Sequence, residues 1–540
     1  MKMTGAQAII KALEIENVEI VFGYPGAAIC PFYDALVDSG IKHVLTRHEQ
    51  GAAHAASGYA RATGKPGVCI STSGPGATNL ITGIATAYMD SIPLVAITGQ
   101  VSTEQIGRDV FQEADITGAT APFCKHGYLV KNVEDLQRII KEAFYIATTG
   151  RPGPVIIDIP IDVQNKECDF DYPENINIRG YKPTYKGHAM QIKKAADLIS
   201  SCKQPVICAG GGVISGGASS ELIQFAEKCR IPVVTTLMGK GSIPSEHPLN
   251  YGMLGSHGVY AANHAVYNAD LLIILGARVG DRAMTNVDRI SRNARIIHVD
   301  IDPAEIGKNI DTEIPIVGHV KNVLSQLIEE TEQGDVEEWN RQLDDVRKKH
   351  PLKYTQKKDF VNPKYLMTRL SERITGNHIV TTEVGQNQIW AANYLQIKRP
   401  GAFITSGGMG TMGYGLPAAV GAKIGSREST VIAIAGDGSF QMSMQELGTI
   451  KQENIVIKII LLNNSRLGMV RELQKAKYKS RYSQVILESN PDFIKLAEAY
   501  GFKGETIKSD DQIDQALDRM FSDDKTYILE CIVDPEEGTL

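Results

Sequence analysis

Short runs of β-branched and aliphatic residues alternate with longer stretches of helical spacing along the whole chain, and this alternation limits the fold more than any other feature. Such runs predict buried strands, and helices between them predict parallel sheets covered on both faces. The predicted fold class is therefore α/β, with doubly wound parallel sheets. The predicted strands lie at residues 19–22, 43–46, 67–71, 94–98 and 155–159, at 205–209, 232–236, 271–275 and 295–299, and at 378–382, 430–435, 456–462 and 527–533.

The length of 540 residues predicts three domains, because a single hydrophobic core stops growing at about 250–300 residues. A polar stretch containing Pro and aromatic residues, at 167–187, indicates a linker after the first unit. A highly charged stretch of helical spacing, 329–350, predicts a solvated helix that leads out of the second unit. The predicted domains are residues 1–168, 188–335 and 363–540.

The composition disfavours several classes of protein. A formal charge of −6 gives no basic footprint for nucleic acid, and the eight cysteines form no C-x-x-C pair or zinc-like spacing, so we expect them to be reduced. No apolar run reaches about 18 residues, and charges interrupt the apolar runs near the N-terminus, so we expect neither a membrane span nor a signal peptide. The expected location is the cytoplasm.

Two predicted neighbouring strands each end in residues suited to a metal-bound diphosphate. The strand at 430–435 runs into Gly436-Asp437-Gly438, and the strand at 456–462 runs into Asn463-Asn464. Ligands bind beyond the carboxyl ends of parallel strands, where glycine lets the backbone approach phosphate and Asp437 and Asn464 offer hard oxygen ligands for Mg²⁺. The G-D-G triplet alone is a common turn, whereas its combination with Asn-Asn predicts a metal-diphosphate site.

A third motif places a carboxylate at the junction between a strand and a helix. In TRHEQGAAHAASGYAR, Glu49 immediately precedes an Ala-rich helix predicted at 50–63. A glutamate there is, by itself, more often a helix cap. The segment, together with the G-D-G and Asn-Asn pair, resembles the thiamine-diphosphate enzymes. That resemblance implies that Glu49 hydrogen-bonds N1′ of the aminopyrimidine, which makes the cofactor's own amino group a base.

The resemblance extends to the remaining cofactor contacts. GGMGTMGYGLPAA resembles the block that grips the aminopyrimidine, so the backbone of Gly410 would bind its amine and Met412 would wedge the cofactor into a bent shape. The residues that the resemblance assigns to the diphosphate half are Gln386, Asn387, Gly436, Gly438, Ser439 and Met469 for the cofactor, and Asp437, Asn464 and Arg466 for the Mg²⁺ ion.

Over nearly its whole length the chain resembles the catalytic subunits of acetohydroxyacid synthase, also called acetolactate synthase. Pyruvate decarboxylases carry His-His where this chain has Phe111-Gln112, and glyoxylate carboligase lacks the activating Glu, so both are disfavoured. The motifs that carry the resemblance are GYPGAAI, STSGPGATN, IGRDVFQEADI, TTGRPGPVIIDIP, YGMLGSHG, GARVGDR, HVDIDPAEIGKN and EVGQNQIWAA.

This resemblance implies the reaction and the assembly. Pyruvate would lose CO₂, and the remaining two-carbon unit would be joined to a second 2-ketoacid, in branched-chain amino acid biosynthesis. Gln112, next to Phe111, would orient the reacting centre, and Arg282 would hold the carboxylate of the second substrate. A homodimer or tetramer with the active site at the subunit interface is implied, and a small regulatory subunit is compatible with it.

The middle domain would bind a structural FAD that takes no part in redox chemistry. AGGGVISGG is glycine-rich but is not G-x-G-x-x-G, so the flavin rests on the resemblance. The positions that match the family's flavin contacts are Arg151, Gly211, Thr236, Leu237, Leu254, His257, Gly276, Arg278, Asp300 and Ile301.

Departures from the family pattern lie around the substrate channel and the flavin. Leu473 replaces a Trp thought to favour 2-ketobutyrate as acceptor, so we expect pyruvate to be preferred. A carboligase paralogue with another aldehyde or ketone acceptor stays open, as does a non-catalytic binding protein in which Glu49 is idle. The other departures are Ser256 for Met, Ile161 for Lys, Ala27 for Gly, Ser102 for Pro, Val279-Gly280 for Phe-Asp, His319 for Asp and Asn387 for His.

Overall fold

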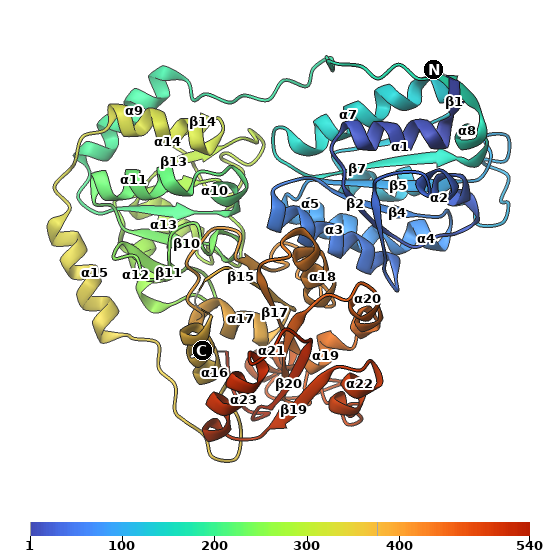
Figure 1. Cartoon of the computed structure of the whole chain (residues 1–540). Coiled ribbons are helices and arrows are strands. Elements are labelled where there is room, and N and C mark those ends of the chain that lie inside the picture. The colour runs from blue at the N-terminus through green and yellow to red at the C-terminus, as the bar shows by residue number, and fades with distance from the viewer. Residues whose placement is uncertain (1, 375, 540) are drawn as a thin grey trace.

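The computed structural model describes residues 2–374 and 376–539 and confirms the α/β class (Figure 1). Three six-stranded sheets follow one another along the chain, and every strand pair within them is parallel. Helices cover the sheets, as the alternation in the sequence predicts. A short antiparallel pair, β1 (Lys2–Thr4) with β8 (Glu167–Asp169), joins the start of the first unit to its end.

The first unit contains the sheet with strand order β3-β2-β4-β5-β7-β6. Its strands are β2 (Ile20–Gly23), β3 (Lys42–Leu45), β4 (Gly67–Ser71), β5 (Leu94–Gln100), β6 (His126–Leu129) and β7 (Pro154–Pro160). Its helices are α1 (Gly5–Ile15), α2 (Cys30–Leu36), α3 (Glu49–Thr63), α4 (Pro75–Asn79), α5 (Ile81–Asp90), α6 (Ile116–Thr120), α7 (Leu136–Thr148) and α8 (Ile161–Asn165).

The middle unit has the strand order β11-β10-β9-β12-β13-β14, which is the order of dinucleotide-binding domains. The strand order reverses between β9 and β12, so a ligand crevice is expected there. The strands are β9 (Pro205–Ala209), β10 (Val233–Thr235), β11 (Asn250–Met253), β12 (Leu271–Leu275), β13 (Arg295–Asp300) and β14 (Ile314–Val317). The helices are α9 (Ala189–Ser201), α10 (Gly211–Ser215), α11 (Ser219–Cys229), α12 (Tyr260–Asn268), α13 (Val287–Asn293) and α14 (Val320–Glu330), and α15 (Glu337–Lys349) follows them.

The third unit repeats the topology of the first, with the order β16-β15-β17-β18-β20-β19. Its reversal point lies between β15 and β17. The strands are β15 (His378–Thr382), β16 (Phe403–Ile404), β17 (Thr430–Gly436), β18 (Ile457–Asn463), β19 (Lys503–Ile507) and β20 (Tyr527–Ile532). The helices are α16 (Pro363–Arg373), α17 (Gln386–Tyr394), α18 (Gly415–Gly425), α19 (Asp437–Phe440), α20 (Leu447–Gln452), α21 (Gly468–Lys477), α22 (Phe493–Ala499) and α23 (Ile513–Met520).

Two local predictions were wrong. The charged stretch 329–350 is not one helix, because α14 ends at Glu330 and α15 begins at Glu337. Nor is α15 wholly solvated: Trp339 is buried and donates from its indole nitrogen to the carbonyl of Pro205, 3.2 Å away. The helix therefore packs along the middle unit before the chain enters the third (Figure 1).

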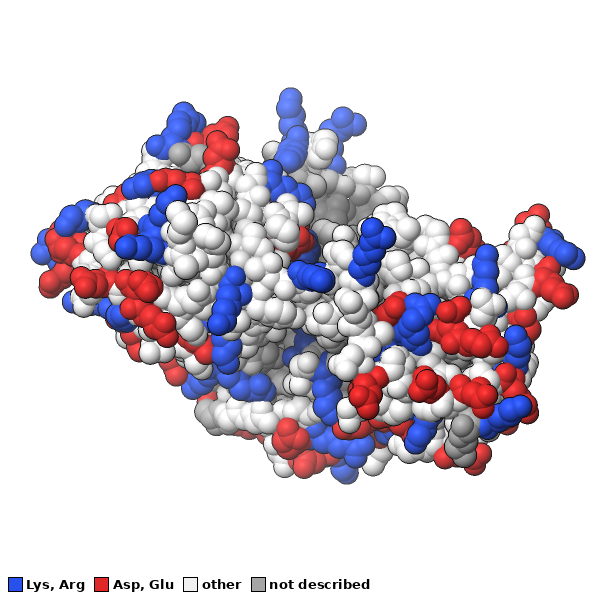
Figure 2. All heavy atoms as spheres, turned by 90° about the horizontal axis from the view of Figure 1, so that it is seen from above, with Lys and Arg blue, Asp and Glu red and all other residues white. Residues whose placement is uncertain are grey.

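The distribution of surface charge and the state of the cysteines can be compared with the expectations from the composition. Acidic and basic side chains are intermixed over the face seen in Figure 2. All eight cysteines are free. In the part of the chain that the structure describes, no helix combines the length and the apolar character needed to cross a bilayer.

The first and third units are held together by a close crossing of α3 and α18. A Cβ added at Gly58 would lie 2.1 Å from the carbonyl oxygen of Ala418, and one added at Gly421 would lie 1.7 Å from that of Ala55. Both helix backbones therefore approach to a separation that only glycine permits. Beside this contact the hydroxyls of Ser57 and Tyr414 are 3.0 Å apart.

Replacing Gly421 with Ala should destabilise the protein by about 1–3 kcal/mol or more, because the new methyl group cannot fit without moving α3 and α18 apart. Thermal unfolding of the purified variant measures this loss. Gly40→Ala is the matched control, since a Cβ at Gly40 has no neighbour within 4 Å and should change stability by at most about 0.5 kcal/mol. Equal unfolding midpoints for the two variants would contradict the close approach of α3 and α18 at Gly421.

Candidate active site

The two predicted metal ligands lie together at the carboxyl edge of the third sheet. Asp437 begins α19 directly after β17, and Asn464 follows β18, the strand next to β17. Both side chains are buried. One Asp437 carboxylate oxygen accepts a hydrogen bond from Asn490 Nδ2 at 2.7 Å, and burial raises the pKa of Asp437 to about 6. A buried carboxylate at a strand end is suited to a bound cation.

The other residues predicted to bind the diphosphate half of the cofactor lie near this pair. Gln386, the first residue of α17, accepts a hydrogen bond from Asn464 Nδ2 at 2.9 Å and donates to Glu472 at 2.7 Å. A Cβ added at Gly436 would lie 3.0 Å from Nδ2 of Asn387, so these two residues face each other across the reversal point between β15 and β17. The hydroxyl of Ser439 donates to the Gly436 carbonyl at 3.2 Å, and Met469 is half-buried on α21.

The donor set fits a diphosphate bound through Mg²⁺. Asn387 keeps a buried Oδ1 without a partner; this oxygen is an acceptor, so it suits a cation or an N–H donor, whereas only its Nδ2 could donate to phosphate. Among the described residues, no group of three His, Cys, Asp or Glu side chains could hold a metal by itself. Mg²⁺ commonly uses one or two carboxylates together with substrate phosphates. Arg466 offers only donors in its side chain, so it could reach a metal only through its main-chain carbonyl.

The predicted pyrimidine block reaches the same edge. A Cβ added at Gly438 would lie 3.9 Å from Cε of Met412, so Met412 extends toward the G-D-G turn. Gly410 has φ +67°, a conformation that favours glycine. The amide of Gly413 donates to the buried carboxylate of Glu383 at 2.7 Å and fixes the chain just after Met412.

Glu49 is the first residue of α3, one position earlier than the predicted start of that helix. Its carboxylate accepts a hydrogen bond from Asn79 Nδ2 at 3.0 Å. The backbone before it is anchored to the third unit, because the amide of Arg47 donates to Glu446 at 3.0 Å and its guanidinium donates to the Gly448 carbonyl at 3.1 Å. The helix start that carries Glu49 is thus held from both units.

Gln112 lies beside the same short helix as Glu49. A Cβ added at Gly74, the N-cap of α4, would lie 2.8 Å from the Gln112 carbonyl oxygen, and one at Gly76 would lie 3.2 Å from Glu49 Oε1. Gln112 itself has φ +60°, which is uncommon for a residue other than glycine and is frequent at functional sites. The Gly-Pro-Gly turn therefore brings the two predicted first-unit residues to one place.

Three predicted substrate contacts are open to solvent within one chain. Phe111 is 86% exposed and Leu473 is 46% exposed. The side chain of Arg282 is 82% exposed and lies 3.7 Å from Asp281. The Arg282 guanidinium is not enclosed by a pocket in this single chain, so its role in binding the acceptor stays a prediction.

The predicted flavin residues gather at the carboxyl edge of the middle sheet. Gly211 and Gly276 follow β9 and β12, the strands on either side of the reversal point. Thr236 and Leu237 follow β10, Asp300 ends β13 and Ile301 follows it, and burial raises the pKa of Asp300 to about 6. The other predicted flavin residues come from other segments. Arg151 pairs with Glu305 at 2.8 Å, and Arg278 lies against Gly408. Leu254 is buried, and the His257 carbonyl accepts a hydrogen bond from Asn393.

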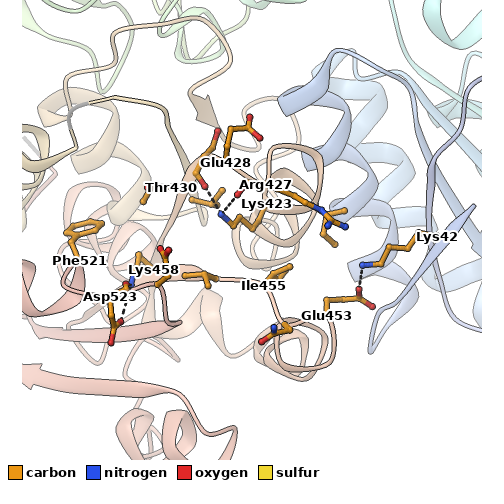
Figure 3. Close-up of a pocket in the computed structure, with 16 residues that line it drawn as sticks. Lys42, Lys423, Arg427, Glu428, Thr430, Glu453, Ile455, Lys458, Phe521 and Asp523 are labelled. Atoms are coloured by element: carbon orange, nitrogen blue, oxygen red, sulfur yellow. Dashed lines mark hydrogen bonds and ion pairs between the residues drawn. The ribbon is translucent and has the colours of Figure 1, made fainter.

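A cavity of about 540 Å³ lies at the opposite edge of the third sheet (Figure 3). It is lined by Thr430 and Lys458, near the amino ends of β17 and β18, and by Lys42 of the first unit. Lys458 donates to the carbonyls of Asp523 and Lys525, each at 2.7 Å, so its ammonium holds the loop between α23 and β20 against β18. None of the predicted cofactor residues line this cavity.

Two contacts of the site were missed in the sequence analysis. Asn490 contacts both Asp437 and Asn463, and Asn79 contacts Glu49, yet neither asparagine was singled out. Asn79 ends the STSGPGATN motif, so that motif was an available signal. Asn490 stands in a polar loop without a distinguishing pattern.

Comparison with known proteins covers nearly the whole chain. Three family profiles match: "Thiamine pyrophosphate enzyme, N-terminal TPP binding domain" at residues 3–119, the central domain at 192–327, and the "C-terminal TPP binding domain" at 383–531. A protein of Methanocaldococcus jannaschii named "Probable acetolactate synthase large subunit" is 50% identical over 99% of this chain and 93% of its own length. An "Acetolactate synthase large subunit" of Buchnera aphidicola is 47% identical over 95% and 91%, and one of Corynebacterium glutamicum is 47% identical over 98% and 87%.

Proposed function

The chain belongs to the acetolactate synthase large subunits of the thiamine pyrophosphate enzymes, and on this premise we propose that it makes 2-acetolactate and CO₂ from two molecules of pyruvate. The observation that carries the proposal is that Asp437, Asn464 and Asn387 lie together at the carboxyl edge of the third sheet; Glu49 stands at the start of α3 in the first unit. The three predicted domains, 1–168, 188–335 and 363–540, each contain one six-stranded sheet and stay our proposed boundaries.

Each half of the site has a separate task. Thiamine diphosphate, when bound, supplies the carbon nucleophile that a 2-ketoacid needs to lose CO₂. Asp437 and Asn464 would hold Mg²⁺ and, through it, the diphosphate, while Met412 and Gly410 would set the shape of the pyrimidine half. Glu49 would hold a proton at N1′ of the aminopyrimidine. The metal assignment is supported by the burial of Asp437 and by the hydrogen bonds that place Asn490 on Asp437 and Asn464 on Gln386.

Half-buried Gln112 and the exposed residues Arg282 and Leu473 would orient the substrates. Gln112 would donate to oxygen at the reacting centre, and Arg282 would form a charge-assisted pair with the carboxylate of the acceptor. At the predicted acceptor site, Leu473 is a smaller and more flexible side chain than the Trp that it replaces. This favours pyruvate over 2-ketobutyrate as acceptor.

The middle unit is proposed to bind FAD as a structural cofactor. Its strand order and the position of Gly211 and Gly276 at the ends of β9 and β12 support a dinucleotide in the crevice between those strands. The close approach of these turns supports it further, since a Cβ added at Gly212 would lie 2.8 Å from Cα of Gly276.

Assembly completes the proposal. Exposed Phe111, Met442, Val470 and Leu473 are large apolar side chains near the predicted site, which supports a homodimer or tetramer whose second chain covers them. Glu49 of one chain would then serve the Asp437 edge of its partner. The relatives are named large subunits, which supports a small regulatory partner. We propose a cytoplasmic location, from the sequence alone.

The test is a direct assay of the purified protein with thiamine diphosphate, Mg²⁺ and pyruvate, following pyruvate loss and acetolactate formation. Acetolactate in stoichiometric relation to the pyruvate lost is expected. Folded protein that makes none would overturn the proposal, and pyruvate loss that requires an added aldehyde would favour the carboligase alternative. Flavin absorbance released on denaturation tests the middle unit separately.

Replacing Leu473 with Trp should raise the use of 2-ketobutyrate relative to pyruvate by about tenfold or more, because a flat aromatic wall adds contact with the extra methylene, which is worth about 1–3 kcal/mol. The two products formed from mixed acceptors measure the ratio. Leu352→Trp is the control, since Leu352 is similarly exposed, at 41%, but lies outside the predicted site. An unchanged ratio in Leu473→Trp would remove Leu473 from the acceptor pocket.

A further inference from the structure

The segment that carries Gly410 and Met412, here called the 405–412 loop, lies between β16 and α18. Strand pairing ends with β16, so the backbone N–H and C=O groups of the 405–412 loop must be held by other groups. Part of that support is internal to the third unit: Thr411 donates its amide to Ser406 Oγ at 3.0 Å, and Gln388 Nε2 donates to the Ser406 carbonyl at 3.0 Å. The rest comes from other units.

Helix α5 of the first unit supplies the strongest outside contacts. Asp90, its last residue, accepts the amide of Gly408 at 2.7 Å through one carboxylate oxygen and the amide of Gly407 at 3.2 Å through the other. One turn earlier, Thr86 Oγ1 lies 2.7 Å from Thr411 Oγ1. Residues four apart lie on one face of a helix, so α5 presents a single polar face along the loop.

The glycines of the loop are explained by what lies on its two sides. A Cβ added at Gly407 would lie 2.4 Å from Sδ of Met238, and one added at Gly408 would lie 2.8 Å from the Arg278 guanidinium. Met238 and Arg278 belong to the middle unit, so the loop backbone is enclosed between that unit and Asp90. At this junction all three units meet.

Positive charge and amide donors around Asp90 oppose the effect of burial on its carboxylate. Burial raises the pKa of Asp90, while Arg61, the two loop amides and Arg278 act in the opposite direction. Arg61 also donates to the Thr405 carbonyl at 2.6 Å, which ties the same cation to the beginning of the loop. Charge-assisted hydrogen bonds of this kind are about twice as strong as neutral ones.

We propose that Asp90 is a positioning residue for thiamine diphosphate: by accepting the amides of Gly407 and Gly408, it fixes the loop that presents Gly410 and Met412 to the aminopyrimidine. The inference rests on the proposed function, which assigns those two residues to the cofactor. Asp90 touches neither substrate nor cofactor in this scheme and acts through the loop. Its loss would leave the loop in its binding conformation for only a fraction of the time, and the apparent Kd rises by the inverse of that fraction.

The test compares Asp90→Ala and Asp90→Asn with Asp270→Asn in the full chain. Asp270 is the matched control, because it also accepts two consecutive amides, those of Lys203 at 2.7 Å and Gln204 at 2.9 Å, but in the middle unit away from the loop. Each apo protein is titrated with thiamine diphosphate in excess Mg²⁺, followed by intrinsic fluorescence. Turnover at saturating cofactor and thermal unfolding of the apo protein are measured in parallel.

Asp90→Ala should raise the Kd for thiamine diphosphate by about 10- to 100-fold, with a smaller change in kcat at saturation. Asp90→Asn should have a smaller effect, because its amide can accept one of the two N–H groups. A folded Asp90→Ala protein with wild-type Kd would overturn the inference, and so would an Asp270→Asn protein with an equal rise. Wild-type protein that fails to bind thiamine diphosphate would instead overturn the proposed function.

Amide hydrogen exchange in the wild-type apo protein tests the same contact without a substitution, should the variants not fold. Peptides containing Gly407 and Gly408 should exchange slowly, because the Asp90 carboxylate holds both amides. Exchange at the rate of an unprotected loop would overturn the assignment.

Discussion

Replacing Glu49 with Gln should lower kcat for acetolactate formation by about 10²- to 10⁴-fold, the range that a positioned acid–base group contributes. Gln keeps the shape of the side chain and can still contact Asn79, which lies 3.0 Å from the carboxylate. It cannot hold the proton that N1′ of the aminopyrimidine requires. The Kd for thiamine diphosphate should change far less, because the proposed diphosphate ligands belong to the third unit. Steady-state kinetics and a cofactor titration separate the two effects.

A purely structural role of Glu49 at the start of α3 predicts a different result. His48 is the N-cap of α3 and Glu49 is its first residue, so losing the Glu49 charge would lower stability by about 0.3–1 kcal/mol through the helix dipole without removing turnover. Glu337→Gln is the matched control, since Glu337 is the first residue of α15 and lies outside the predicted site. If Glu49→Gln and Glu337→Gln both keep wild-type turnover, Glu49 only stabilises the start of α3 and its catalytic assignment is wrong.

The central strands could be predicted from the sequence, and the strands at the edges mostly could not. β4, β9, β12 and β15 are buried along their whole length, and their predicted limits match the structure. Five strands of the six-stranded sheets were missed, and each lies at the edge of its sheet: β6, β11, β14, β16 and β19. An edge strand needs burial on fewer sides, so β19, with the sequence KGETI, lacks the apolar run that signals a buried strand.

Some residues of the candidate site could likewise be predicted from the sequence, and others could not. Asp437 and Asn464 could be predicted to meet, because each follows a strand and neighbouring parallel strands end at one edge. Asp90 could not, since nothing in its local sequence says that α5 will end against two amides of the third unit. The proposed flavin crevice could be predicted only in part. Gly211 and Gly276 form no recognised sequence fingerprint, and they become neighbours only through the strand order of the middle sheet.

Asp437→Asn should weaken binding of Mg²⁺ and of thiamine diphosphate by about 10- to 100-fold or more, because it removes the charge of the carboxylate that follows β17 and leaves only neutral amides at the two ligand positions. Burial raises the pKa of the wild-type Asp437 carboxyl to about 6. Protons therefore compete with the metal as the pH falls through about 6, and wild-type Mg²⁺ affinity should decline there. The variant has no carboxyl at this position, so its weak affinity should lose that pH dependence.

Isothermal titration of the apo protein with Mg²⁺ and thiamine diphosphate, at several pH values between about 5 and 8, measures both the affinity and its pH profile. Asp492→Asn is the control, because Asp492 caps α22 two positions after Asn490, which contacts Asp437, and Asn is an equally good cap. Wild-type affinity in Asp437→Asn would place the metal elsewhere. A reduced affinity that keeps the same pH profile would mean that another group, such as Glu383 with a pKa raised to about 7 by burial, sets the titration.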